Sequence, residues 1–79
     1  MDQGATPSRV IDGRALEPPE PLVLTLDALD TLGAQETLLV LLDREPLPLY
    51  QTLRASGHTW QTRRGTDGSV EVLIWRMPD

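Results

Sequence analysis

Cysteine, lysine, phenylalanine and asparagine are all absent from this sequence of 79 residues. The absence of cysteine excludes disulfides, thiolate metal ligands, persulfides and cysteine nucleophiles. The aromatic residues are limited to Trp60, Trp75 and Tyr50. We therefore expect a core that is mostly aliphatic.

Positive charge and long apolar runs are also scarce. The formal net charge is −5, which opposes contact with nucleic-acid phosphates and anionic membrane surfaces. No apolar run approaches the roughly 20 residues that cross a bilayer, and the opening segment MDQGATPSRV lacks the apolar stretch of a signal peptide. We therefore expect no nucleic-acid partner, no membrane association and a cytoplasmic location.

The length leaves room for one small domain, with a monomer as the favoured state. A chain this short buries only about 60% of its unfolded surface, so its core is modest. Residues 1–8 are small and polar with one proline, which predicts a disordered N-terminal tail. We expect the domain to cover residues 9–77 and residues 78–79 to form a C-terminal tail.

The first half of the domain predicts a strand, a helix and a second strand. Arg9–Asp12 contains a short apolar pair typical of a strand, and Glu36–Asp43 is nearly continuously apolar, as in a central strand. The helix is expected over Pro21–Leu32, with Gly33 as a left-handed C-terminal cap. Its apolar stripe has spacings of four, three and three residues: Leu22, Leu26, Leu29 and Leu32.

The second half predicts a helix followed by a hairpin. A helix is expected over Pro48–Ser56, with proline in its first turn and Gly57 as its stop. The segments HTWQTRR and SVEVLIWRM alternate with a period of two, and Asp67-Gly68 between them is a hairpin turn signal.

This order of elements predicts an α/β fold of the α+β two-layer type, with two helices on one face of a four-stranded mixed sheet. The first two strands are expected to pair in parallel through the helical crossover, and the last two form an antiparallel hairpin. If the helices cover the face of Val70, Val72 and Ile74, then Leu73, Trp75 and Trp60 form an exposed apolar patch. If the faces are reversed, those three side chains belong to the core.

The segment IDGRALEPPEPL resembles the opening of the TusA/SirA-like domains, which are small bacterial sulfur-carrier proteins. Their pattern is an apolar residue, Asp, two residues, Gly-Leu, any residue and Cys-Pro-x-Pro. Ile11, Asp12 and Leu16 match this pattern, and Ala15 replaces its glycine. Pro18 stands where the cysteine belongs. The resemblance therefore implies the fold but not the persulfide chemistry.

Two further segments support the resemblance, which covers residues 9–77. GAQETLLVLLD is similar to the Gly-x-x-Glu-x-Leu strand entry of the family. DREPLPLY, residues 43–50, resembles an Asp-x-x-Pro-x-Pro-Leu-Tyr signature of a cysteine-free branch that is a domain of unknown function. The resemblance to this branch does not point to any particular enzymatic activity.

Glu17 and Glu20 are the candidates for an acid/base pair. General acid catalysis needs a carboxyl group in an apolar pocket, and the sequence indicates no such pocket around them. Carboxylates are also favoured in the first turn of a helix for purely structural reasons. Pro18 and Pro19 fit the same interpretation of a stiff, acidic helix start. We expect no enzyme and no catalytic residues.

His58, Asp43 and Glu45 are weak candidates for metal ligands. A metal site needs several ligands within reach, and without cysteine only carboxylates could join the single histidine. A surface histidine at the start of a strand is the alternative interpretation. We expect no resident metal and no cofactor.

Arg14 and Arg44 each follow one of the two parallel strands. Ligands of open sheets often bind beyond the carboxyl ends of such strands, where arginine can recognise a carboxylate or an acidic partner. Solvated loop arginine is the alternative. The residues that we predict to form an interaction surface are Arg14, Glu17, Pro18, Pro19, Glu20, Asp43, Arg44 and Tyr50.

Two functions from different classes remain open. The first is a non-catalytic binding or adaptor domain that presents its first loop and the DREPLPLY loop to a protein partner. The second is a small-ligand or metal-binding protein associated with sulfur or redox metabolism, using Arg14, Asp43, Glu45 and His58.

Overall fold

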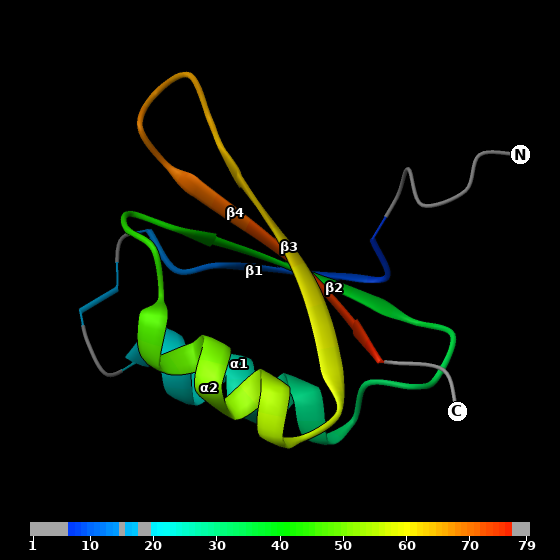
Figure 1. Cartoon of the computed structure of the whole chain (residues 1–79). Coiled ribbons are helices and arrows are strands. Elements are labelled where there is room, and N and C mark those ends of the chain that lie inside the picture. Colours follow the sequence, from blue (N-terminus) through cyan, green and yellow to red (C-terminus); the bar gives the residue numbers. More distant parts are fainter. Residues whose placement is uncertain (1–6, 15, 18–19, 77–79) are drawn as a thin grey trace, which may run out of the picture.

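The computed structural model describes residues 7–14, 16–17 and 20–76. It confirms the predicted order of strand, helix, strand, helix, strand, strand, with two helices on one face of the sheet (Figure 1). The elements are β1 (Arg9–Asp12), α1 (Glu20–Asp30), β2 (Thr37–Leu42), α2 (Leu47–Ala55), β3 (His58–Arg64) and β4 (Val70–Arg76).

The four strands have the order β1-β2-β4-β3, so β1 and β3 are the edges. β1 pairs with β2 in parallel, and both pairs that involve β4 are antiparallel. The mixed sheet is therefore the one that the order of elements predicts, because α1 is a crossover and β3–β4 is a hairpin.

The core lies between the sheet and the two helices. Val70, Val72 and Ile74 have no solvent exposure, and Leu49 and Leu53 of α2 pack against the same cluster. Each fully buried aliphatic side chain of this size contributes about 1.5–3 kcal/mol relative to an exposed one. The helices therefore cover the valine face, which is the first of the two arrangements compatible with the sequence.

The other face of the sheet is not covered by any described element. Leu73 and Trp75 are half-buried there. The prediction that Trp60 joins the same patch is wrong, because Trp60 lies on the opposite face, where it pairs with Ile74 and stacks on Tyr50. A two-residue turn at Asp67-Gly68 would bring Trp60 opposite Trp75, but the observed register differs by one residue. A shift of one residue moves a side chain to the other face of a strand.

The end of α1 also differs from the prediction. The helix ends at Asp30 rather than Leu32, and the left-handed glycines among the described residues are Gly57 and Gly68, not Gly33. Instead of closing a left-handed cap, the Gly33 amide donates a hydrogen bond of 2.6 Å to Glu36 Oε1. The predicted helix stop at Gly57 is correct, since its φ angle of 79° suits glycine alone.

The predicted N-terminal tail is too long by at least one residue. Ser8 is hydrogen bonded to Thr37 through its amide, which donates to the Thr37 carbonyl at 3.0 Å, and through its hydroxyl, which accepts from the Thr37 amide at 3.2 Å. Residues 1–6 of that tail prediction and the prediction for residues 78–79 fall outside the described residues. Within the described part of the chain, neither helix has the length and hydropathy to cross a membrane.

Candidate functional site

An apolar pocket of about 460 Å³ lies at the carboxyl ends of the parallel strands β1 and β2, between the first turns of α1 and α2. This is the edge of an open sheet where ligands commonly bind. Its lining is mostly aliphatic and proline: Gly13, Leu16, Pro21, Leu22, Leu42, Asp43, Arg44, Glu45, Pro46, Pro48 and Leu49.

Gly13 closes one wall of the pocket because it follows β1 directly and packs tightly. A Cβ atom at this position would lie 3.0 Å from Leu42 Cδ2 and 3.2 Å from Pro21 Cβ. The Gly13 amide donates a hydrogen bond of 2.7 Å to the Leu41 carbonyl, which prolongs the parallel pairing into the loop. The absence of a side chain at Gly13 thus allows this close approach of the chain to β2, and a larger residue would have to displace its neighbours.

The second wall comes from the segment that resembles the branch signature. Asp43, Pro46, Pro48 and Leu49 of DREPLPLY all line the pocket. Pro48 lies in the first turn of α2, where a missing amide hydrogen breaks no helical hydrogen bond. The signature therefore builds a rigid helix start that also forms the pocket wall.

Tyr50, the last residue of the signature, points to the other side of α2. Its ring stacks on Trp60 with 5.0 Å between centroids, and its hydroxyl donates to Glu45 Oε2 at 3.2 Å and lies 2.6 Å from Thr62 Oγ1. Burial is the main cause that raises the pKa of the Tyr50 phenol. The sequence predicts that Tyr50 contacts a partner, whereas in the structure it anchors α2 to β3 and holds Glu45 at the rim of the pocket.

Arg14 does not line the pocket, although it lies at the edge of the sheet that the sequence predicts. Its guanidinium forms a two-pronged pair with Asp12, with Nε and Nη2 each 2.9 Å from a carboxylate oxygen. This hydrogen bonding lowers the pKa of Asp12 to about 2. Arg44 differs, because it is exposed and lines the pocket beside Asp43 and Glu45.

The two acids of the segment LEPPEP, residues 16–21, are exposed to solvent. Glu17 follows the lining residue Leu16, and Glu20 begins α1 with its amide bonded to the Glu17 carbonyl at 2.9 Å. Neither carboxylate lies in the apolar environment that general acid catalysis needs. Pro18 and Pro19, which are predicted to share this surface, lie outside the described residues.

The candidate metal ligands are not brought together. His58 begins β3 opposite Arg76, whereas Asp43 follows β2 at the opposite end of the sheet, about 20 Å away along the strands. No group of three His, Asp or Glu side chains with metal-binding proximity occurs in the part of the chain that the structure describes. His58 instead bonds through Nδ1 to Ser56 Oγ at 2.8 Å.

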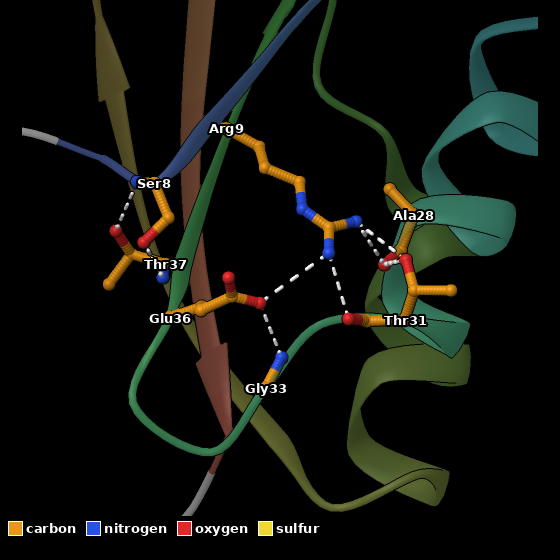
Figure 2. A network of polar contacts seen from close by, with 7 residues as sticks. All are labelled: Ser8, Arg9, Ala28, Thr31, Gly33, Glu36 and Thr37. Carbon is orange, nitrogen blue, oxygen red and sulfur yellow. Dashed lines mark hydrogen bonds and ion pairs between the residues drawn. The ribbon is translucent and has the colours of Figure 1, made fainter.

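The end of the sheet opposite the pocket carries a polar network centred on Arg9 (Figure 2). The guanidinium donates to the Thr31 carbonyl at 2.8 Å, to Thr31 Oγ1 at 2.6 Å and to the Ala28 carbonyl at 3.3 Å. It also lies 3.4 Å from Glu36 Oε1, which accepts the Gly33 amide. Arg9 thereby caps the last carbonyl groups of α1, and Glu36 fixes the loop to β2.

The sequence indicates the charged rim of the pocket but not its walls. Asp43, Arg44 and Glu45 stand out as charged residues near a strand end, whereas Gly13, Leu16 and the lining prolines are readily taken for fold elements alone. The available signal is the pairing of two parallel strands whose following loops are both rich in leucine and proline. Such loops enclose apolar space at the edge where ligands bind.

Comparison with known families supplies the identification. The family model described as "Uncharacterized conserved protein (DUF2249)" matches residues 10–76. The chain belongs to this family. The match covers both helices and the whole sheet except Arg9. The DUF2249 domain and the fold described above are therefore the same unit.

A solved structure places the DUF2249 domain beside the SirA-like proteins, as its sequence motifs predict. The crystal structure of a SirA-like protein from Desulfitobacterium hafniense is similar, with a TM-score of 0.75 and 26% sequence identity. The match covers 84% of this chain and 93% of the other. No curated protein matches the sequence. The protein is thus a SirA-like domain without cysteine.

Proposed function

We propose that this DUF2249 domain is a non-catalytic, cytoplasmic binding module that docks a protein partner at the pocket between α1 and α2. The observation that carries the proposal is the pocket itself, because both segments that resemble family motifs contribute to its walls. Leu16 and Pro21 come from LEPPEP, and Pro46 and Pro48 come from DREPLPLY. Segments that are far apart in the sequence converge on one apolar space at a site-forming edge.

The absence of a reactive group supports a binding role over catalysis. The resemblance puts Pro18 at the position of the sulfur-carrier cysteine, between two residues that line the pocket. Proline offers no nucleophile, and the exposed Glu17 and Glu20 lack an apolar environment.

The character of the pocket favours a protein partner. Its walls are apolar, and three charged residues, Asp43, Arg44 and Glu45, are exposed at its rim. Protein interfaces use this arrangement, in which an apolar anchor fills a central pocket and polar groups surround it.

A small apolar ligand is the second candidate. The cavity volume of about 460 Å³ falls in the range of small-molecule sites, which is about 300–1,000 Å³. This alternative predicts a ligand that copurifies with the protein and is released on denaturation, and mass spectrometry of the denatured protein tests for it. Recovery of no small molecule, together with a protein partner that depends on the pocket, favours the first candidate.

The test of the proposed function compares two replacements of an apolar residue by serine. Leu16→Ser changes a lining residue that is not part of the buried core. Val23→Ser removes a similar apolar side chain from the exposed side of α1, where Val23 is 49% exposed. Affinity capture with quantitative mass spectrometry should recover proteins with the wild-type chain and Val23→Ser that are lost with Leu16→Ser. If both variants recover the same proteins as the wild type, the pocket is not the docking site.

A further inference from the structure

Carboxylates outnumber arginines around the pocket. The segments that form it, residues 12–22 and 42–49, contain five acids and two arginines: Asp12, Glu17, Glu20, Asp43, Glu45, Arg14 and Arg44. All seven are exposed. An apolar pocket with a net negative surround attracts cationic partners and repels anionic ones.

Of the two arginines, only Arg44 lies at the rim of the pocket, and it is flanked by two carboxylates. Arg14 is already engaged by Asp12 at 2.9 Å and lies 4.0 Å from Asp67. Arg44 is the arginine that lines the pocket, and the residues on either side of it in the chain, Asp43 and Glu45, are carboxylates that line it too. The rim therefore offers an incoming group more acceptors than donors.

Two backbone positions at the start of each helix have no free amide donor for an anion. Pro21 and Pro48, in the first turns of α1 and α2, have no amide hydrogen. The amides of Glu20 and Leu49 donate instead to the carbonyls of Glu17 and Pro46, at 2.9 and 3.0 Å. Helix starts that bind anions present free amides together, and these positions do not.

We propose that the partner docks as a peptide segment that places an apolar side chain in the pocket and a lysine or arginine beside it, against Asp43 and Glu45. This inference rests on the proposed function and specifies the chemistry of its partner. The apolar walls of Leu16, Pro46 and Pro48 receive the anchor, and the rim carboxylates select the flanking charge. The net charge of −5 steers a basic partner toward the domain from a distance.

The experiment selects binding peptides from random sequences. A phage library of random dodecapeptides is panned against the immobilised full-length chain, and the enriched peptides are synthesised and measured by fluorescence anisotropy. We expect peptides with a leucine, isoleucine, methionine or aromatic anchor and a lysine or arginine within two positions of it. Replacing the anchor by alanine should remove binding, because the anchor provides most of the interface energy.

Charge variants of the protein then test the rim. Asp43→Asn with Glu45→Gln removes two carboxylates, and the amide oxygen introduced by Glu45→Gln can still accept the Tyr50 hydroxyl. We expect the dissociation constant to rise about five-fold, which is the size of exposed charge contributions at an interface. Asp27→Asn with Asp30→Asn makes the same charge change on the exposed surface of α1, outside the pocket lining. It should change the dissociation constant less than about two-fold.

Failure of the inference and failure of the proposed function give different results. If the enriched peptides lose binding with Leu16→Ser but are acidic or uncharged, or are insensitive to the Asp43 and Glu45 changes, the inference is wrong and the docking site stands. If no enriched peptide responds to Leu16→Ser, both proposals are overturned. Circular dichroism and thermal unfolding of each variant show that the comparison is made between folded proteins.

Discussion

The two ends of α1 lie against the two ends of β1 and use their residues in opposite ways. At the carboxyl end of the helix, Arg9 and Glu36 meet the backbone of Ala28, Thr31 and Gly33 through hydrogen bonds of 2.6–3.3 Å (Figure 2). At its amino end, leucine and proline side chains surround open space of about 460 Å³.

The difference between these ends separates structural from functional residues. The polar groups of the Arg9 network are satisfied within the chain, as folding requires of partly buried donors and acceptors. Among the described residues, apolar groups at the pocket end surround open space, and an occupant there would add packing contacts. At the carboxyl end of α1 the charged residues Arg9 and Glu36 thus have a structural role, whereas at its amino end the apolar residues that line the pocket are the ones that we propose for binding.

The largest effect is expected from Arg9→Met, which keeps the aliphatic stem and removes the guanidinium. The carbonyls of Ala28 and Thr31 lose their cap, and Glu36 loses its ion pair. Since charged hydrogen bonds contribute about 1.5–3 kcal/mol and this side chain is 35% exposed, we expect unfolding to be easier by about 2 kcal/mol. Urea denaturation measures the change.

Arg14→Met is the matched control, because it removes an arginine whose ion pair with Asp12 is exposed. Exposed pairs contribute little to stability, so the loss should be clearly smaller than for Arg9→Met. Equal losses for the two variants would show that the network at the end of α1 is not a stabilising cap.

Glu36 should show an intermediate effect that depends on its replacement. Glu36→Ala removes the acceptor of the Gly33 amide, and we expect a loss of about 1 kcal/mol in unfolding free energy. Glu36→Gln keeps an oxygen acceptor and should lose less than half as much. Combined with Arg9→Met, Glu36→Ala should lose less than the sum of the single changes, because the two residues share contacts. Additive losses in the same urea experiment would argue against a shared network.

A pH-dependent effect is expected at the Arg9 end of the sheet, from His58. Burial lowers the pKa of His58 below its usual 6.5, so the folded protein binds this proton more weakly than the unfolded chain does. The contribution to stability is complete above about pH 6.5 and is lost as the pH falls through the lowered pKa. His58→Gln should flatten the decline in urea stability below pH 6.5. If the loss of stability below pH 6.5 is the same in His58→Gln as in the wild type, groups other than His58 cause it.

A separate pH effect is expected at the pocket end, from Asp12. Its hydrogen bonds with Arg14 lower the pKa to about 2 from the ordinary 3.8. The stabilisation is complete above about pH 3.8 and disappears as the pH falls through about 2, because protonation then breaks the pair. Asp12→Asn should remove this step from an acid denaturation curve without altering the decline that we assign to His58.

The sequence predicts the fold well where local signals and long-range packing agree. The bounds of β1 and β3 are correct to the residue, and the start of α2 is marked by its own prolines. The predicted end of α1 is too late because Arg9, 19–22 residues away in the chain, caps the carbonyls of Ala28 and Thr31. No local pattern reports a partner at that separation.

The candidate site is predictable in position and not in composition. Two parallel strands followed by acidic and arginine-containing loops point to the edge where the pocket lies, and Asp43 and Arg44 line that pocket. Two other outcomes depend on three-dimensional geometry. Arg14 turns to Asp12, two residues away in its own loop, and Trp60 changes face through a one-residue difference in hairpin register.

The smallest effect on stability is expected from Leu16→Ser, although its effect on binding should be the largest. Leu16 is half-buried at the pocket and is not among the residues that pack against the core. We therefore expect the free energy of unfolding in urea to change by less than about 0.5 kcal/mol, as for surface substitutions.

Arg9→Met should have the reverse effect, because it should leave binding of the selected peptides unchanged while lowering stability. Leu16→Ser should weaken peptide binding without lowering stability, and Arg9→Met should lower stability without weakening binding. A general loss of folding cannot produce both results. A large stability loss with Leu16→Ser would show instead that the pocket wall belongs to the core, and the contrast between the two ends of α1 would fail.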